Sequence, residues 1–165
     1  MLLTGTFKRS VDEKLRIAIP KRFRESLSTK PDQANSGQAN SDQAAKSDQA
    51  VLYIAPGTDG SLSLYTEESF ARLAEQLDQA SPAGKDVRAF SRLFFARAES
   101  VDLDRQGRVR IPAELAAHAS IAQGEAMMIG VRDRLEIWNT EKWNQYMEVN
   151  QSEYDALAEK ALERS

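Results

Sequence analysis

Apolar and polar residues alternate in two short segments, 17–19 and 109–111, in the way that β-strands do. The stretches before them, 4–11 and 98–103, are also predicted to be extended. A tight turn that begins at an aspartate separates the two strands each time, and an aspartate carboxylate can accept hydrogen bonds from backbone N–H groups two residues on. The pattern therefore predicts two β-hairpins.

Further elements are predicted downstream of each hairpin. A proline stops the second strand, and residues that favour a helix follow it, since proline is well tolerated in a first helical turn. Two more apolar strands then form a second hairpin, and Thr66 and Asn139 stand where helix N-caps belong. The predicted helices are 21–27 and 113–118, and the predicted strands are 51–54, 62–65, 127–131 and 135–138.

These elements occur twice because the sequence itself repeats. Asp, Arg, Ile and Pro of the segment 11–20 return in the segment 103–112 at a constant offset of 92 residues. The segment 62–70 returns as 135–143 at an offset of 73, so the first copy carries 19 extra residues. These fall in 30–50, which is built of Asp-Gln-Ala and Asn/Ser units without large apolar side chains and is predicted to be a disordered loop.

The repeat predicts how the chain is divided. Apolar residues at helical spacing predict two helices between the copies and one long helix after the second. The predicted parts are a first module at 1–70 with the loop at about 30–50, connecting helices at 71–97, a second module at 98–143 and a C-terminal helix at 144–165.

Composition excludes several classes of function. The chain has no cysteine, which removes disulfides, thiolate metal sites and cysteine nucleophiles. Its one histidine, His118, has no acidic or serine partner at a recognisable spacing, so we expect neither an enzyme nor a bound metal or cofactor. With no long apolar run and no signal-peptide pattern, we expect a cytoplasmic protein without a membrane span or a small-molecule substrate.

Charge is distributed unevenly although the net charge is only −3. Residues 1–30 hold eight Lys/Arg against three Asp/Glu, and residues 85–110 hold seven against four. Residues 31–84 hold two against eight. Positive charge therefore accompanies both copies of the repeated motif, which favours a nucleic-acid partner, although surface Lys and Arg also serve solubility alone.

The repeated motif reads Asp-x-Lys-x-Arg-(apolar)-x-Ile-Pro at Asp12 and Asp-x-x-Gly-Arg-(apolar)-x-Ile-Pro at Asp104. In this motif, its tandem occurrence and the Leu-x-(Leu/Ile)-(Tyr/Trp) strand that follows, the chain resembles the MraZ family over nearly its whole length outside the loop. The resemblance implies an α+β fold, namely a pseudo-twofold β-barrel of two interlocked swapped-hairpin (AbrB-like) modules with flanking helices.

The resemblance also implies a function. It indicates a ring-like homo-oligomer that binds double-stranded DNA and regulates transcription of the cell-division and cell-wall gene cluster, associated with the nucleoid. It places the family's DNA-contacting positions on Lys14, Arg16 and Arg108, while Arg105 and Arg110 are predicted from position and charge. The predicted DNA-binding residues are thus Lys14, Arg16, Arg105, Arg108 and Arg110, and the predicted turn-forming residues are Asp12, Asp104 and Gly107.

Two departures from the family pattern leave alternatives open. Leu15 stands where the family has glycine, so either the first turn takes another shape or backbone strain is tolerated there. Gln106 replaces a lysine, although it can still hydrogen-bond a base edge or a phosphate. The arginines could instead be internal ion pairs that only fix the hairpins. The chain would then be an oligomeric interaction or scaffold protein with weakened DNA binding, which is the alternative to a regulator that represses by occluding a promoter.

Overall fold

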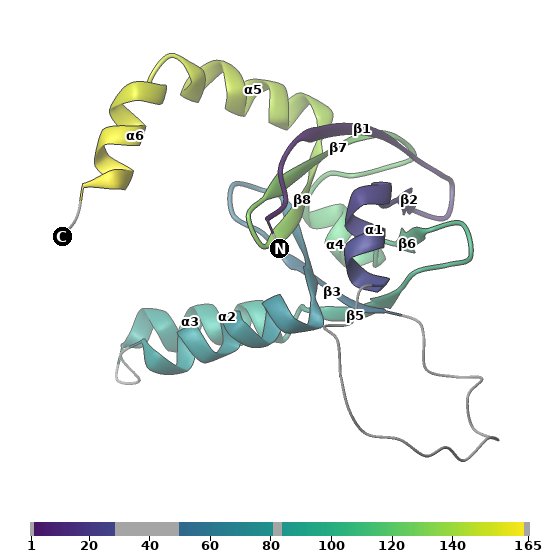
Figure 1. Ribbon diagram of the computed structural model, residues 1–165, viewed down its shortest axis with the longest axis horizontal. Coiled ribbons are helices and arrows are strands. Elements are labelled where there is room, and N and C mark those ends of the chain that lie inside the picture. The colour runs from purple at the N-terminus through teal and green to yellow at the C-terminus, as the bar shows by residue number, and fades with distance from the viewer. Residues whose placement is uncertain (1, 29–49, 81–83, 164–165) are drawn as a thin grey trace, which may run out of the picture.

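The computed structural model describes residues 2–28, 50–80 and 84–163, so the loop predicted at 30–50 lies outside the described residues except for Ala50. A curved antiparallel sheet occupies one end of the molecule, and helices extend from it towards the other end (Figure 1). The first module contributes β1 (Thr6–Val11), β2 (Arg16–Ala18), α1 (Lys21–Ser28), β3 (Val51–Pro56) and β4 (Leu62–Thr66).

The second module repeats this order. It contributes β5 (Glu99–Asp102), β6 (Arg108–Arg110), α4 (Ala113–His118), β7 (Gly124–Val131) and β8 (Arg134–Asn139). The helices outside the repeat are α2 (Glu67–Gln79), α3 (Lys85–Phe95), α5 (Thr140–Gln151) and α6 (Tyr154–Leu162).

The two modules share one sheet of eight strands in the order β5-β3-β4-β8-β7-β1-β2-β6. The first strand of each module pairs with the third strand of the other, as β1 with β7 and β5 with β3. The two edge strands of this sheet, β5 and β6, are joined by a turn in which the Asp104 N–H donates to the Arg108 carbonyl at 2.8 Å. This turn brings the two edges together and nearly closes the sheet into a barrel. Neither module can therefore form its part of the barrel alone.

The strand register follows a pseudo-twofold axis. In the β2–β6 pair Ile17 lies opposite Val109, and the offset of 92 makes these two residues equivalent. In the β4–β8 pair Ser63 lies opposite Glu136, which are equivalent under the offset of 73. Equivalent residues face each other only on the axis itself. The predicted α+β barrel of two interlocked repeated modules is confirmed.

The core fills the barrel with equivalent side chains from both modules. Ile17 and Val109 are fully buried, and the short helices α1 and α4 add Phe23 and Leu115, each about 1% exposed. Phe23 and Leu115 are themselves related by the offset of 92. Burying a large apolar side chain contributes roughly 1.5–3 kcal/mol, so these helices help to hold the barrel closed.

Aromatic contacts attach the outer helices to the barrel. Phe70 of α2 lies 5.8 Å from Tyr65 of β4, measured between ring centroids, and Phe94 of α3 lies 5.9 Å from Phe70. In the second module, Trp143 of α5 lies 5.3 Å from Trp138 of β8. The Tyr65–Phe70 and Trp138–Trp143 contacts each join the last strand of a module to the helix after it, so the repeat extends into these helices.

The helix starts follow the predictions, whereas the C-terminus differs from them. The side chain of Thr66 accepts a hydrogen bond from the Ser69 N–H, and that of Asn139 from the Lys142 N–H, which confirms both N-caps. The prediction of a single long helix at the C-terminus is wrong, because α5 ends at Gln151 and α6 begins at Tyr154. In the last turn of α5 the Asn150 side chain donates to the Tyr146 carbonyl at 2.8 Å, and such side-chain hydrogen bonds compete with those of the helical backbone.

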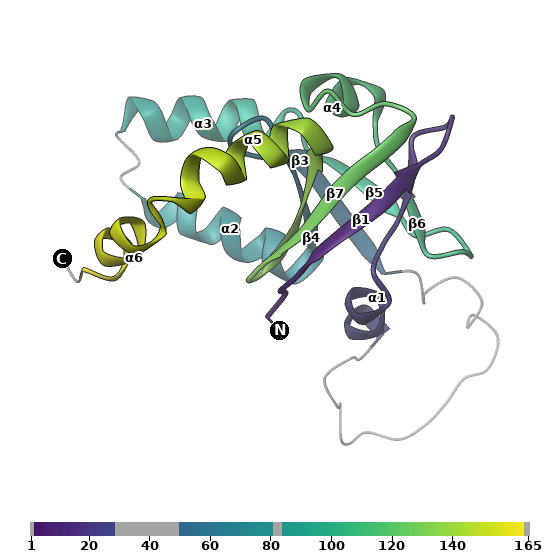
Figure 2. The ribbon, with the colours of Figure 1, turned by 90° about the horizontal axis from the view of Figure 1, so that it is seen from above.

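Figure 2 shows that the β1–β2 and β5–β6 hairpins project from the end of the barrel that faces away from α2, α3, α5 and α6. Within the described ranges, no helix has the length and apolar character needed to cross a membrane.

Candidate nucleic-acid interface

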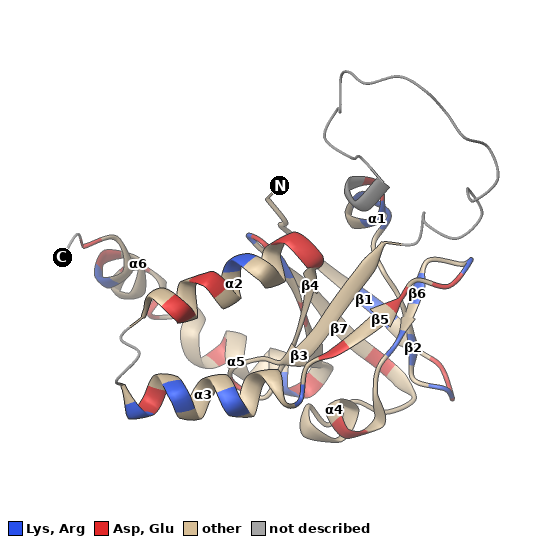
Figure 3. Ribbon diagram, turned by 90° about the horizontal axis from the view of Figure 1, so that it is seen from below, with Lys and Arg blue, Asp and Glu red and all other residues tan. Residues whose placement is uncertain are grey.

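The two hairpin tips contain residues of both charges at one end of the barrel (Figure 3). In the first tip, one carboxylate oxygen of Asp12 accepts hydrogen bonds from the backbone N–H groups of Lys14 and Arg16, both at 2.9 Å. The other oxygen accepts from Nε of Arg16 at 2.6 Å. The aspartate thus ties the turn to the strand that follows it.

The second tip repeats this geometry. One oxygen of Asp104 accepts from the backbone N–H groups of Gln106, at 2.9 Å, and Arg108, at 3.0 Å. The other oxygen lies 2.8 Å from both Nε and Nη2 of Arg108. The aspartate and arginine of each motif therefore act together as a clamp on the turn.

These hydrogen bonds lower the pKa values of both carboxyl groups. The Arg16 backbone N–H has the largest effect on the pKa of Asp12, partial desolvation opposes it, and the Arg16 side chain adds to it. The Arg108 backbone and side chain lower the pKa of Asp104 in the same way. Both carboxylates are thus held in the charged form, which favours the clamp.

A left-handed residue completes each turn and links it to the other module. Leu15 has φ 58° and Gly107 has φ 72°. The carbonyl of Leu15 accepts from the N–H of Ile111, and the carbonyl of Gly107 from the N–H of Ile19, both at 2.9 Å. The first turn therefore has the same shape as the second, and the strain at leucine, about 1–2 kcal/mol, is tolerated.

The two modules fill the space beside this left-handed residue differently. Leu15 is partly buried and packs against the barrel core, which offsets its strain. A Cβ atom on Gly107 would lie only 2.6 Å from Cδ and 2.7 Å from Cζ of Arg24. The second module has Ala116 at the position equivalent to Arg24. The space beside the first turn is thus filled by Leu15 of the turn itself, and the space beside the second turn is filled by Arg24 of α1.

The structure divides the predicted DNA-binding residues into two groups. Arg16 and Arg108 keep about 33% and 26% of their side chains exposed, and both are ion-paired. Arg108 also reaches the carboxylate of Asp12 in the other module, with Nη1 at 3.8 Å. Internal ion pairs are therefore present, as one of the two alternatives expected, and both arginine side chains stay partly exposed.

The other predicted cations are exposed. Lys14 and Arg105 lie in the hairpin tips, and Arg110 extends from β6 directly opposite Arg16 of β2. Gln106 is exposed beside Arg105. The structure therefore brings the predicted residues to one end of the barrel. Lys14, Arg105 and Arg110 are the ones most accessible to a partner.

Sequence reasoning did not single out an open groove beside the first hairpin. It has a volume of about 410 Å³ and is lined by residues of β1, β2 and the motif, among them Lys8, Arg9, Ser10 and Ala18. The alternation of outward-facing side chains along 6–11 was the available signal for Lys8 and Ser10. Lys8 and Ser10 lie beside Arg108 only because β2 pairs with β6 of the other module, which places Ala18 opposite Arg108.

The hairpins and their shared barrel define a class of protein: an AbrB-like barrel of two interlocked modules, each presenting an Asp/Arg-clamped hairpin. A family sequence model described as "MraZ protein, putative antitoxin-like" matches residues 94–165. A "Transcriptional regulator MraZ" from Lactiplantibacillus plantarum is 36% identical over 159 residues, covering 96% of this chain and 97% of the relative.

Two further relatives have the same name and align over nearly the same length. The protein from Clostridium tetani is 35% identical, and that from Alkaliphilus oremlandii is 34% identical, each over 162 residues that cover 98% of both chains. The chain belongs to the MraZ family. The relatives are named as regulators rather than as enzymes.

Proposed function

We propose that this chain is a sequence-specific DNA-binding transcriptional regulator that presents both hairpins to double-stranded DNA. The observation that carries the proposal is the pair of matching clamped turns, in which Asp12 and Arg16 are repeated by Asp104 and Arg108. A two-stranded β-ribbon can enter the major groove, where arginine can bridge two acceptors on guanine. The relatives, which are named as transcriptional regulators, support the same function.

The two groups of cations would have different tasks. Lys14, Arg105 and Arg110 are exposed and would contact DNA directly, together with Gln106. Arg16 and Arg108 would hold the turns in shape, and their partly exposed side chains would add to the positive potential. The aspartates would stay bound to their own turns, because a free carboxylate at this surface would repel phosphate.

A homo-oligomer is part of the proposal. In the first module, Phe94 of α3 covers the aromatic contact between Tyr65 and Phe70. In the second module, the ring contacts of Trp138 and Trp143 within the described residues are with each other and with Tyr146 of α5, and none comes from α6. Apolar residues on α5 and α6 remain exposed, namely Tyr146, Met147, Val149, Tyr154, Leu157 and Leu162. A second copy of the chain would cover this surface.

The oligomer would be ring-like and would present several hairpin pairs to repeated operator sites. Each phosphate contact is weak, so repetition multiplies contacts to give affinity. The target would be the cell-division and cell-wall gene cluster, in a cytoplasmic, nucleoid-associated protein. Occlusion of a promoter is the simplest mechanism, and a footprint located only upstream of the polymerase site would contradict it.

Fluorescence anisotropy tests the DNA-binding function. The protein is added to labelled DNA from upstream of its own gene, and separately to a labelled scrambled duplex, across a salt series. The double variant Lys14→Ala/Arg105→Ala should weaken binding and flatten the salt dependence by about 0.9 per lost phosphate contact. The matched control Lys85→Ala/Lys160→Ala also removes two exposed cations, but from helices away from the hairpins.

The second candidate is the scaffold protein with weakened DNA binding. One of its two grounds was Leu15, and the retained turn geometry removes that ground. Gln106 still favours it, because a charge is missing from the second tip. Absence of binding at low salt by a folded oligomer would support the scaffold and end the regulator proposal.

A further inference from the structure

The two modules differ in charge beside their matching hairpins. Lys8 and Arg9 of β1 are equivalent to Ser100 and Val101 of β5 under the offset of 92. The strand that leads into the first hairpin therefore carries two cations that its counterpart lacks.

The short helices after the hairpins differ in the same direction. Lys21 and Arg22 at the start of α1 are equivalent to Ala113 and Glu114 at the start of α4. All four side chains are exposed. Strand and helix together make the first module the basic side of a barrel whose backbone is nearly symmetric.

The groove of about 410 Å³ lies on this basic side. It exists because Ser10 and Ala18, which line it, are small, while the longer side chains of Lys8, Arg16 and Arg108 surround them. Counting Arg9, four cations and one carboxylate line the groove. Since Arg108 belongs to the second module, the swapped pairing of strands brings the groove together.

Two of the four groove cations, Arg16 and Arg108, are ion-paired with Asp12 and Asp104, so Lys8 and Arg9 supply the positive charge that stays available. The single lining carboxylate, Asp12, is engaged by the turn amides and by Arg16. Lys8 forms an ion pair with Glu125 at 3.0 Å, and both side chains are more than half exposed. Exposed pairs of this kind are worth about 0–1 kcal/mol, so Lys8 can exchange this partner for a phosphate.

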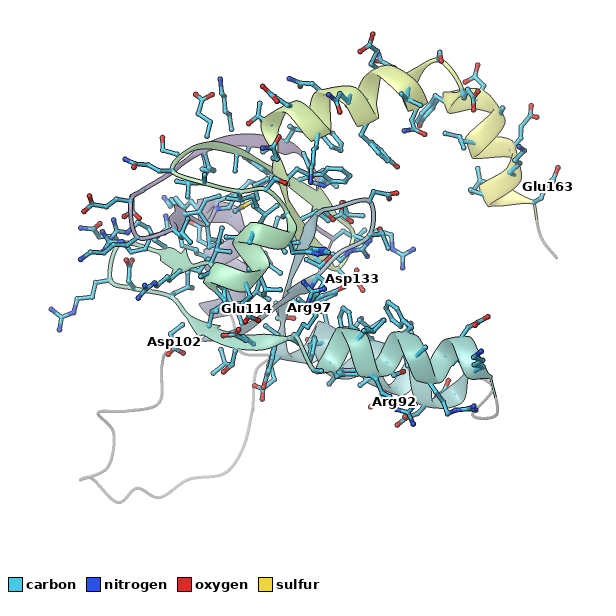
Figure 4. All side chains as sticks on the ribbon, turned by 180° about the vertical axis from the view of Figure 1, so that it is seen from behind. Arg92, Arg97, Asp102, Glu114, Asp133 and Glu163 are labelled. Atoms are coloured by element: carbon cyan, nitrogen blue, oxygen red, sulfur yellow. The ribbon has the colours of Figure 1, made fainter. Side chains whose placement is uncertain are left out.

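The corresponding side of the second module has the opposite character. A hollow of about 480 Å³ there is lined by Glu99, Asp102 and Glu114 against one cation, Arg110. Figure 4 labels Asp102 on β5 and Glu114 on α4, which lie at this face. Asp102 and Arg110 are the equivalents of Ser10 and Ala18, so larger charged side chains replace the small ones.

We propose that the groove over Ser10 and Ala18 binds a phosphate of the DNA backbone, and that the second module has no equivalent phosphate site. This inference rests on the proposed function and adds to it a contact outside the repeated motif. A β-ribbon inserted in the major groove has the DNA backbone along its flanks, and phosphate contacts there fix the register of the protein on the duplex. Each protomer would grip the backbone on one side only.

A matched pair of serine variants tests the asymmetry. Ser10→Glu and Ser100→Glu make the same change on exposed strand positions of β1 and β5, and only the first places a carboxylate in the groove. Ser10→Glu should weaken binding to the upstream duplex by about tenfold or more, because it repels the phosphate. Ser100→Glu should change it by less than about twofold, because salt screens a distant charge.

A third variant, Lys8→Ala, keeps the test independent of any fault that Ser10→Glu causes in the sheet, where residue 10 lies opposite Glu125. It should reduce the log-log salt slope by about 0.9 per bound protomer. Its preference for the specific over the scrambled duplex should stay unchanged, because a phosphate carries no sequence information. Thermal melting and oligomer mass check that each variant is folded.

The outcomes separate this inference from the proposed function. If the unaltered protein does not bind DNA, the proposed function fails and the groove with it. If it binds, but Ser10→Glu and Ser100→Glu weaken binding equally, or Lys8→Ala leaves the salt slope unchanged, the groove is not a phosphate site while the hairpin proposal stands.

Discussion

Gly107 and Arg24 provide a quantitative test of how the two turns are built. A methyl group at residue 107 would have to be accommodated at φ 72° and within 2.6 Å of Cδ of Arg24. The backbone strain costs about 1–2 kcal/mol. Displacing Arg24 also breaks the hydrogen bond from its Nε to the Ile19 carbonyl, 3.1 Å long, which is worth roughly 0.5–1.5 kcal/mol. Gly107→Ala should therefore lower the free energy of unfolding by about 1.5–3.5 kcal/mol.

The equivalent pair in the first module, Leu15 with Ala116, indicates how the cost can be reduced. In an Arg24→Ala background, Gly107→Ala should cost only its backbone strain, because there is no longer a guanidinium to displace. The two changes should therefore couple by about 1 kcal/mol in the favourable direction.

Urea denaturation at a fixed protein concentration measures this coupling for the wild type, both single variants and the double variant. Gly60→Ala is the matched control, since Gly60 has a similar φ of 78° and its Cβ would meet nothing closer than Nζ of Lys142, at 3.4 Å. It should cost only backbone strain and should not couple to Arg24→Ala. If Gly107→Ala shows no more coupling than Gly60→Ala, the reasoning about the space beside the turn is refuted.

Three further predictions concern pH, helix caps and assembly. The pKa values of Asp12 and Asp104 lie below the ordinary 3.8, so their stabilisation is present above that pH and is lost as the pH falls through the lowered values; acid titration of unfolding should show this loss, and Asp12→Asn/Asp104→Asn should lack it. Thr66→Ala should cost about 1 kcal/mol in urea denaturation, since it removes the N-cap of α2, and an unchanged midpoint would contradict that role. Val149→Lys/Leu157→Lys, which place charge on the exposed apolar helices, should lower the mass measured by light scattering; an unchanged mass would show that these helices are not the contact surface.

Much of the fold could be predicted because local patterns and the repeat agree. The alternation at 17–19 and 109–111, the prolines after it and the caps at Thr66 and Asn139 all specify elements that the structure contains. The break after α5 could not be predicted from the apolar spacing, which continues across it. It coincides with a local bond from the Asn150 side chain to the backbone.

The candidate site was predictable only in part, for a related reason. The motif itself identified the clamped turns, because the aspartate and arginine lie four residues apart and bond within one hairpin. The ion pair of Arg108 with Asp12, and the groove that Arg108 shares with Lys8, depend on strands from different modules. Such contacts follow from the pairing of β2 with β6, which no local pattern encodes.

The retained turn at Leu15 shows how a departure from the family pattern can leave the geometry unchanged. Leucine at φ 58° keeps the carbonyl that receives the Ile111 N–H, and its side chain packs against the core. A substitution that looks like erosion of the motif is thus compensated by its surroundings. At Gln106 the turn is also retained, because the Gln106 N–H still donates to Asp104, and the departure there changes only the charge of the second tip.

Site-specific cross-linking to DNA tests the central claim most directly, and the absence of cysteine from the chain makes it straightforward. A photoactivatable thiol reagent is attached to Lys14→Cys, Gln106→Cys or Val149→Cys in otherwise unchanged protein. The two hairpin-tip positions should both cross-link to the upstream duplex, and the position on α5 should not. Cross-linking from residue 149 with none from residues 14 and 106 would contradict DNA recognition through the paired hairpins.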